Sequence, residues 1–158
     1  MRREFAKLTR ELMSNNEKVF VLTGDLGFGM WDAVRAEYPS RTYNVGAAEQ
    51  LLLGAGAGLA LAGKIPLCYS ITPFLLYRPF EILRNYINHE NIPVKLIGSG
   101  RDRDYAHDGF SHWAEDDKQV LDLFPNIETF HPETTLELKQ NFERLILSDR
   151  PCYINLKR

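Results

Sequence analysis

Hydrophobic and polar residues follow one another along the chain in blocks typical of alternating helices and strands. Residues 3–15 carry Phe5, Leu8 and Leu12 at helical spacing, which predicts an amphipathic helix. Residues 18–25 then form a short apolar run that ends at a Gly-Asp pair, as expected of a buried strand running into a turn. The same alternation continues to the end of the chain.

The same criteria place the other elements. We expect helices at residues 29–37, 47–62, 74–90, 115–123 and 133–147. We expect strands at residues 41–45, 65–71, 93–98, 127–130 and 151–156. Strands that alternate with helices favour a doubly wound α/β fold, in which a mostly parallel sheet carries helices on both faces. Ligands of such sheets bind outside the carboxyl ends of the strands.

The helix expected at 47–62 is unusual because residues 51–62 carry no charge. A helix that is apolar all round is typical of a protein interior. Three of its residues, Gly54, Gly56 and Gly58, each cost a helix about 1 kcal/mol relative to alanine, so we expect a backbone or a flat ligand to come close. Glu49 stands at the start of this helix. It is either a surface charge that favours the helix N-terminus or a buried proton handler.

The length and charge of the chain limit the classes of function that it can have. A chain of 158 residues has the size of one domain, and we expect a single domain over 1–158, with an N-terminal helix at 1–16 and an α/β core at 18–158. The chain has 19 basic and 21 acidic residues, a net charge of −2. It therefore lacks the excess of positive charge that is typical of proteins that bind nucleic acid or an anionic membrane. Two cysteines in apolar runs, and no apolar run of membrane-spanning length, predict a soluble, reduced cytoplasmic protein.

The segment 99–113 is long for a strand-to-helix loop, which usually has about 2–6 residues. Its histidines and aromatic residues argue against disorder, because disordered segments have low hydrophobicity. Two basic residues in it, Arg101 and Arg103, could bind a phosphate or carboxylate of a substrate, although a solvated loop explains them equally well. We therefore interpret 99–113 as a functional loop.

Several motifs occur in a characteristic order. They are Thr23-Gly24-Asp25-Leu26, the segment Arg41 to Gln50 with Asn44-Val45-Gly46-Ala47-Ala48-Glu49, the segment Thr72 to Phe80, and Asp108-Gly109-Phe110-Ser111-His112 followed by Glu115-Asp116. Taken together, they resemble the pyrimidine-binding domain of the transketolase-like thiamine diphosphate enzymes. The resemblance runs from about residue 18 to the end of the chain.

The resemblance implies a cofactor site. In this family the glutamate that matches Glu49 hydrogen-bonds N1′ of the aminopyrimidine and so promotes proton removal from C2 of the thiazolium. Burial favours the protonated form of such an acid. Phe74, Tyr77 and Phe80 would line the pyrimidine, with core packing as the alternative for such a stripe, above all for Phe80. Asp25 matches an acid near the subunit interface, and it could instead only cap its strand end.

The resemblance also implies substrate contacts. His112 matches a histidine at the substrate channel, and Asp108 matches an acid that contacts substrate hydroxyls. A histidine can donate to a sugar hydroxyl or a developing oxyanion. Phe110 replaces the small or cyclic residue usual at its position, and His107 has no match. We expect no metal site in this chain, because Gly24-Asp25-Leu26-Gly27 lacks the downstream asparagine that binds magnesium in the diphosphate-binding domain.

These implications define one leading hypothesis. The chain would be the small subunit of a split transketolase that moves a two-carbon ketol unit between sugar-like substrates. A separately encoded partner would hold the diphosphate of thiamine diphosphate and its Mg²⁺, and two heterodimers would assemble into a heterotetramer. The alternative is a non-catalytic α/β module that binds a nucleotide or serves as a scaffold.

Overall fold

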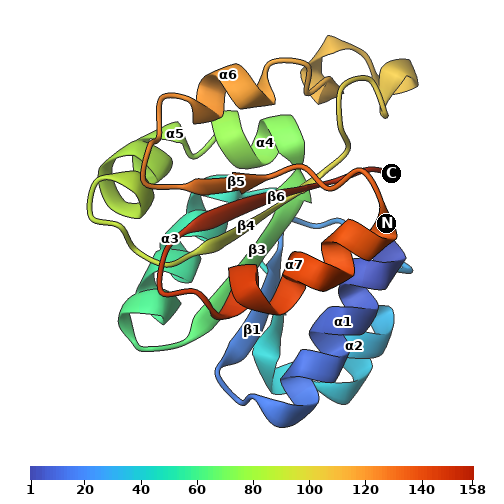
Figure 1. Cartoon of the computed structure of the whole chain (residues 1–158), viewed down its shortest axis with the longest axis vertical. Helices are drawn as coiled ribbons and strands as arrows, with labels where there is room; N and C mark the ends of the chain where they lie inside the picture. The colour runs from blue at the N-terminus through green and yellow to red at the C-terminus, as the bar shows by residue number, and fades with distance from the viewer.

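The computed structural model describes all residues, 1–158, and its centre is one six-stranded parallel sheet (Figure 1). The strands are β1 (Val19–Thr23), β2 (Thr42–Asn44), β3 (Ile65–Ile71), β4 (Lys95–Ser99), β5 (Glu128–Phe130) and β6 (Cys152–Leu156). Their order across the sheet is β2-β1-β3-β4-β6-β5, and every neighbouring pair is parallel. The predicted α/β fold is confirmed, and the sheet is parallel throughout.

Seven α-helices precede or connect the strands. They are α1 (Arg2–Asn15), α2 (Asp32–Glu37), α3 (Glu49–Leu61), α4 (Thr72–Tyr77), α5 (Phe80–Ile82), α6 (Asp117–Leu121) and α7 (Thr135–Leu147). Shorter helical turns are η1 (Pro39–Arg41), η2 (Leu83–Asn88), η3 (Ala106–Asp108) and η4 (Phe110–His112), of which η2 is a π-helix. None of these helices has the length and apolar character needed to cross a membrane.

The sheet buries a separate apolar core on each face. On one face α1, α2 and α7 pack against alternate residues of the strands and against one another, and Phe5 of α1 meets Phe142 of α7 edge to face at 5.3 Å. On the other face α3, α4 and α6 pack against the intervening residues (Figure 1). Because side chains of a strand alternate between its faces, both faces of each central strand are apolar, which explains the continuous hydrophobic runs in the sequence.

The two cysteines are free and buried on opposite faces of the sheet, Cys68 in one core and Cys152 in the other. Burial in apolar surroundings raises the pKa of Cys152 to about 12. It raises the pKa of Cys68 still further. Both thiols therefore stay protonated at neutral pH and serve as core side chains, as the sequence predicted.

The prediction of one continuous helix at 74–90 is wrong. The structure divides it into α4, α5 and the π-helical turn η2. The break falls at Arg78 and Pro79, because proline has no backbone N–H and its ring clashes with the preceding turn. Arg78 consequently lies directly after the last residue of α4.

Helix α3 is not buried on all sides, which corrects the expectation drawn from its apolar sequence. Leu51 and Leu61 are 57% and 74% exposed, and Gly54 and Gly58 lie on the same outer side. Only Gly56 meets a close neighbour, since a Cβ added there would lie 2.5 Å from Sγ of Cys68. Close approach of α3 to β3 therefore explains Gly56 but not the other two glycines.

Alanine substitutions at two of these glycines should have opposite effects. We expect Gly56→Ala to lower the free energy of unfolding by about 1–3 kcal/mol, because the new methyl group overpacks against Cys68. Gly58→Ala has open space around its new Cβ and should raise the free energy of unfolding by up to about 1 kcal/mol. Urea denaturation measures both. Equal effects of the two substitutions would contradict this packing.

Candidate active site

A cluster of polar groups lies where the direction of the chain through the sheet changes. After β1 the chain continues to β2 on one side, whereas β3 lies on the other side of β1. Such a switch point leaves a crevice at the carboxyl ends of the strands, where α/β proteins bind ligands. Gly24 follows β1, Glu49 begins α3 just beyond β2, and Ser70 lies near the end of β3.

Glu49 is a buried carboxylate, with 2% of its surface exposed. Ser70 Oγ donates a hydrogen bond to Glu49 Oε1 at 2.9 Å, and Arg78 Nη1 forms an ion pair with Glu49 Oε2 at 2.7 Å. A Cβ at Gly24 would come within 3.1 Å of Oε1, so the absence of a side chain there leaves room for the carboxylate. Glu49 is therefore not a surface helix charge.

Arg78 connects Glu49 to an aromatic group. Its guanidinium carbon lies 3.7 Å from the ring centroid of Phe74, and the ring of Phe74 meets the ring of His112 edge to face at 4.9 Å. Residues from α3, β3, α4, the loop 99–113 and the positions just after β1 and α4 thus form one connected set. We call it the Glu49 cluster; its members are Gly24, Glu49, Ser70, Phe74, Arg78 and His112.

The other two aromatic residues of the predicted stripe point to different neighbours. Tyr77 donates to Asp116 Oδ1 at 2.5 Å; burial and this hydrogen bond raise the pKa of Tyr77. Its ring lines a cleft of about 280 Å³ together with Phe110 and others of the loop. Phe80 packs against Phe124 at 5.3 Å. Of the three, only Phe74 has a contact within the Glu49 cluster.

The predicted acids Asp25 and Asp108 are both exposed. Asp25 has a left-handed backbone (φ 58°), its amide donates to Asn44 Oδ1 at 2.9 Å, and its Oδ1 accepts from Asn44 Nδ2 at 3.0 Å. These bonds tie together the carboxyl ends of β1 and β2. Asp108 lies in η3 on the loop, with its Oδ2 at 3.3 Å from Nε2 of His107.

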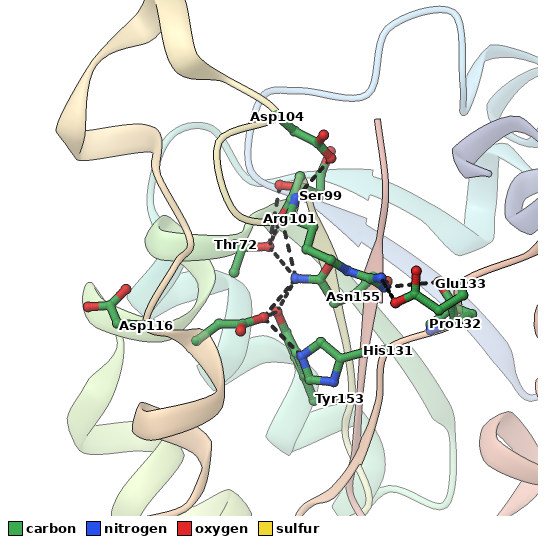
Figure 2. Close-up of polar contacts among 12 residues, drawn as sticks. Thr72, Ser99, Arg101, Asp104, Asp116, His131, Pro132, Glu133, Tyr153 and Asn155 are labelled. Atoms are coloured by element: carbon green, nitrogen blue, oxygen red, sulfur yellow. Dashed lines mark hydrogen bonds and ion pairs between the residues drawn. The ribbon is translucent and has the colours of Figure 1, made fainter.

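Arg101 is part of the interior, which corrects its assignment as a substrate-binding residue. It is 6% exposed, and its guanidinium donates to Asn155 Oδ1 at 3.2 Å, Asn155 O at 3.1 Å, Pro132 O at 3.0 Å and Glu133 Oε1 at 2.7 Å (Figure 2). With its guanidinium already donating to these four acceptors, little remains to bind a substrate. Arg101 instead fixes the start of the loop to β6.

A buried acid, Asp117, anchors the same region. Its Oδ2 accepts from Tyr153 OH at 2.9 Å and Asn155 Nδ2 at 2.8 Å, and it lies 3.0 Å from Nε2 of His131 (Figure 2). Burial opposes ionisation, but the three hydrogen-bonding partners outweigh it and lower the pKa of Asp117. We call Asp117, His131, Tyr153 and Asn155 the Asp117 network.

The Asp117 network holds two elements in place, the helix that carries Phe74 and the loop that carries His112. Asn155 Nδ2 lies 3.3 Å from Gly100 O, and Thr72 Oγ1 donates to the same carbonyl at 2.7 Å. Thr72 begins α4, which carries Phe74, and Gly100 begins the loop that carries His112. The network thereby fixes the first turn of α4 and the base of the loop relative to β6.

Sequence reasoning missed Ser70, Arg78 and Asp117. Arg78 had one available signal, as the single charge in the run Leu75-Leu76-Tyr77-Arg78-Pro79, where a charge next to a helix break needs a partner. Ser70 had a weaker signal, because it lies at the end of a buried strand. Nothing in the sequence connects Asp117 to Asn155, which are joined only by the fold.

A doubly wound parallel domain with a buried carboxylate at its switch point belongs to the class of α/β domains that bind ligands at the carboxyl edge. Within that class, the chain is a member of the family described as "Transketolase, pyrimidine binding domain", which matches residues 1–158. The predicted family is thus confirmed.

Individual proteins that are similar to this chain are also named as transketolases or their subunits. One subunit of the apulose-4-phosphate transketolase of Actinobacillus succinogenes is 38% identical over 76% of this chain and 39% of its own length. A 6-deoxy-6-sulfo-D-fructose transketolase subunit of Clostridium sp. is 26% identical over all of this chain and 49% of its own length. A solved split-gene transketolase, an inactive beta4 tetramer, superposes with a TM-score of 0.86 at 32% identity over 99% of this chain and 50% of that one. The chain spans half or less of these relatives' length.

Replacing the buried acid should change the acid stability of the protein. The lowered pKa means that ionised Asp117 stabilises the fold above the ordinary carboxyl pKa of about 3.8, and that this contribution is lost as pH falls through the folded-state value. We expect Asp117→Asn to cost about 1–3 kcal/mol at pH 5 and progressively less toward pH 2. Urea denaturation across this range measures the difference; a difference that is constant with pH would show that the charge of Asp117 does not matter.

Proposed function

We propose that this chain supplies the pyrimidine half of a thiamine diphosphate site in a transketolase-like enzyme that transfers two-carbon ketol units between sugar-like substrates. The observation that carries the proposal is the buried Glu49 carboxylate, which Arg78 links to the face of Phe74, at the switch point of a domain of the transketolase pyrimidine-binding family. A flat, nitrogen-bearing ring fits such a place, because it can stack on an aromatic face and hydrogen-bond to a carboxylate.

The residues of the chain would have separate roles. Glu49 would hold or exchange a proton at N1′ of the aminopyrimidine, with Ser70 orienting the carboxylate through its 2.9 Å hydrogen bond. Phe74 would stack on the ring, and Tyr77 would close the neighbouring cleft. The bound cofactor supplies the carbanion chemistry at its thiazolium ring. His112, in contact with Phe74, would reach the substrate, and Asp108 would contact its hydroxyls.

The rest of the site would come from a second chain. Among the proteins similar to this one are named subunits of transketolases, which supports a separately encoded diphosphate-binding subunit that also holds Mg²⁺. The exposed face of α3 formed by Leu51, Gly54, Gly58 and Leu61 supports contact with another subunit, since exposed apolar patches commonly mark protein interfaces. Asp25, exposed at the carboxyl edge, would face the partner. We place the complex in the cytoplasm, where thiols stay reduced.

The split site can be tested by cofactor titration. Thiamine diphosphate with Mg²⁺ should bind to the complex of this chain with its diphosphate-binding subunit, which we expect a neighbouring gene to encode, and should not bind measurably to this chain alone. Isothermal titration calorimetry gives both affinities. Tight binding by this chain alone would rule out the division of the site between two chains.

Glu49→Gln should abolish turnover while the chain folds normally. The amide keeps the size of the side chain but cannot exchange the proton, so we expect ketol transfer by the complex to fall about 100-fold or more. Glu128→Gln is the matched control, because Glu128 also pairs with an arginine at 2.7 Å but lies away from the Glu49 cluster. Turnover of the Glu49 variant at the level of the control would remove Glu49 from the mechanism.

His112→Asn should separate substrate chemistry from cofactor binding. If His112 contacts substrate, kcat/KM should fall about 100-fold while the Kd for thiamine diphosphate stays within about threefold. His89→Asn, at a histidine whose side chain is 80% exposed, serves as the control and should change neither quantity. A loss confined to cofactor affinity would assign His112 to the cofactor instead.

A further inference from the structure

Arg78 contacts both the Glu49 carboxylate and the ring of Phe74. One edge of its guanidinium meets Glu49 Oε2 at 2.7 Å, and its guanidinium carbon lies 3.7 Å from the ring centroid of Phe74. A centroid distance this short places the planar group against the ring face. A flat cation with N–H donors therefore fills the space between the Phe74 ring and the buried carboxylate.

The aminopyrimidine of the proposed function would need the same space. It too is planar, it would stack on an aromatic face, and it would meet a carboxylate oxygen through a nitrogen at its edge. The guanidinium and the pyrimidine cannot both lie between Phe74 and Glu49 Oε2. One must leave when the other enters.

We infer that Arg78 is a placeholder for the pyrimidine: in the cofactor-free subunit it stacks on Phe74 and pairs with Glu49, and the cofactor displaces it. This inference rests on the proposed function and adds to it a positioning residue. Until the ring arrives, the positive charge of Arg78 compensates a carboxylate that would otherwise be buried with only the Ser70 hydroxyl as its partner.

The two members of the pair differ in their freedom to move. The Arg78 side chain is 45% exposed, whereas that of Glu49 is 1% exposed. Arg78 also lies between α4 and α5, and its partly exposed side chain can turn into solvent by a change of rotamer. Glu49 and Ser70 would stay in place on α3 and β3. The pyrimidine would replace the guanidinium as the planar partner of the Glu49 carboxylate.

Displacement has a measurable consequence. A ligand that binds only the state with Arg78 turned away has an apparent Kd raised in inverse proportion to the population of that state. If one molecule in about ten is open, removing the guanidinium should tighten cofactor binding about tenfold. An arginine that helped to hold the pyrimidine would have the opposite effect.

The test is the affinity of the complex with its diphosphate-binding subunit for thiamine diphosphate at saturating Mg²⁺, measured by calorimetry. Arg78→Met keeps most of the side-chain length but removes the planar charge, and we expect its Kd to fall about tenfold. The free Arg78→Met subunit should melt at a lower temperature than wild type, because Glu49 loses its cation. Arg144→Met is the matched control: Arg144 pairs with Glu128 at the same 2.7 Å but on the protein surface, and its removal should leave the Kd unchanged.

A second variant tests the same role if Arg78→Met fails to fold. Arg78→Lys keeps the charge but cannot stack as a plane, so it should fold as wild type and tighten binding by a smaller factor. Unchanged or weaker binding in the folded Arg78 variants would overturn the placeholder role while leaving the proposed function intact. A wild-type complex that binds no thiamine diphosphate would overturn the proposed function and this inference with it.

Discussion

The burial of one carboxylate is the constraint on which the site depends. Taking a charge out of water is costly unless hydrogen bonds and an opposite charge compensate it, and Glu49 has one of each. Meeting that requirement brings together side chains from three consecutive elements: the start of α3, β3 and the residue after α4. The absence of a side chain at Gly24 completes the arrangement, because any Cβ there would press on the carboxylate.

A second buried acid supports the first by holding the start of α4. The Asp117 network joins β6, the base of the loop and the first turn of α4 (Figure 2). Phe74 on α4 and His112 on the loop are therefore held by polar contacts as well as by packing. Arg101, expected at the surface, belongs to this framework. The site is therefore built on two internal carboxylates with different tasks, one fixed by three partners and the other held by a partner that can move.

The sequence predicted the architecture well, because strand and helix periodicities are local properties of the chain. All six strands and the doubly wound arrangement followed from these patterns. The failures also have physical causes: Pro79 divides a helix whose apolar spacing continues through it, and the outer face of α3 is exposed although its sequence is apolar. Of the site, Glu49 and Phe74 could be chosen from motifs. Ser70 and Arg78 depend on which side chains the fold brings to one carboxylate, which periodicity does not contain.

The central claim is that Glu49 and Phe74 receive the aminopyrimidine in place of Arg78. The most direct measurement is a crystal structure of the complex of this chain and its diphosphate-binding subunit with thiamine diphosphate and Mg²⁺. We predict the ring against Phe74, N1′ within hydrogen-bonding distance of Glu49, and Arg78 turned away from both. A bound cofactor beside an unbroken Glu49–Arg78 pair would contradict this displacement.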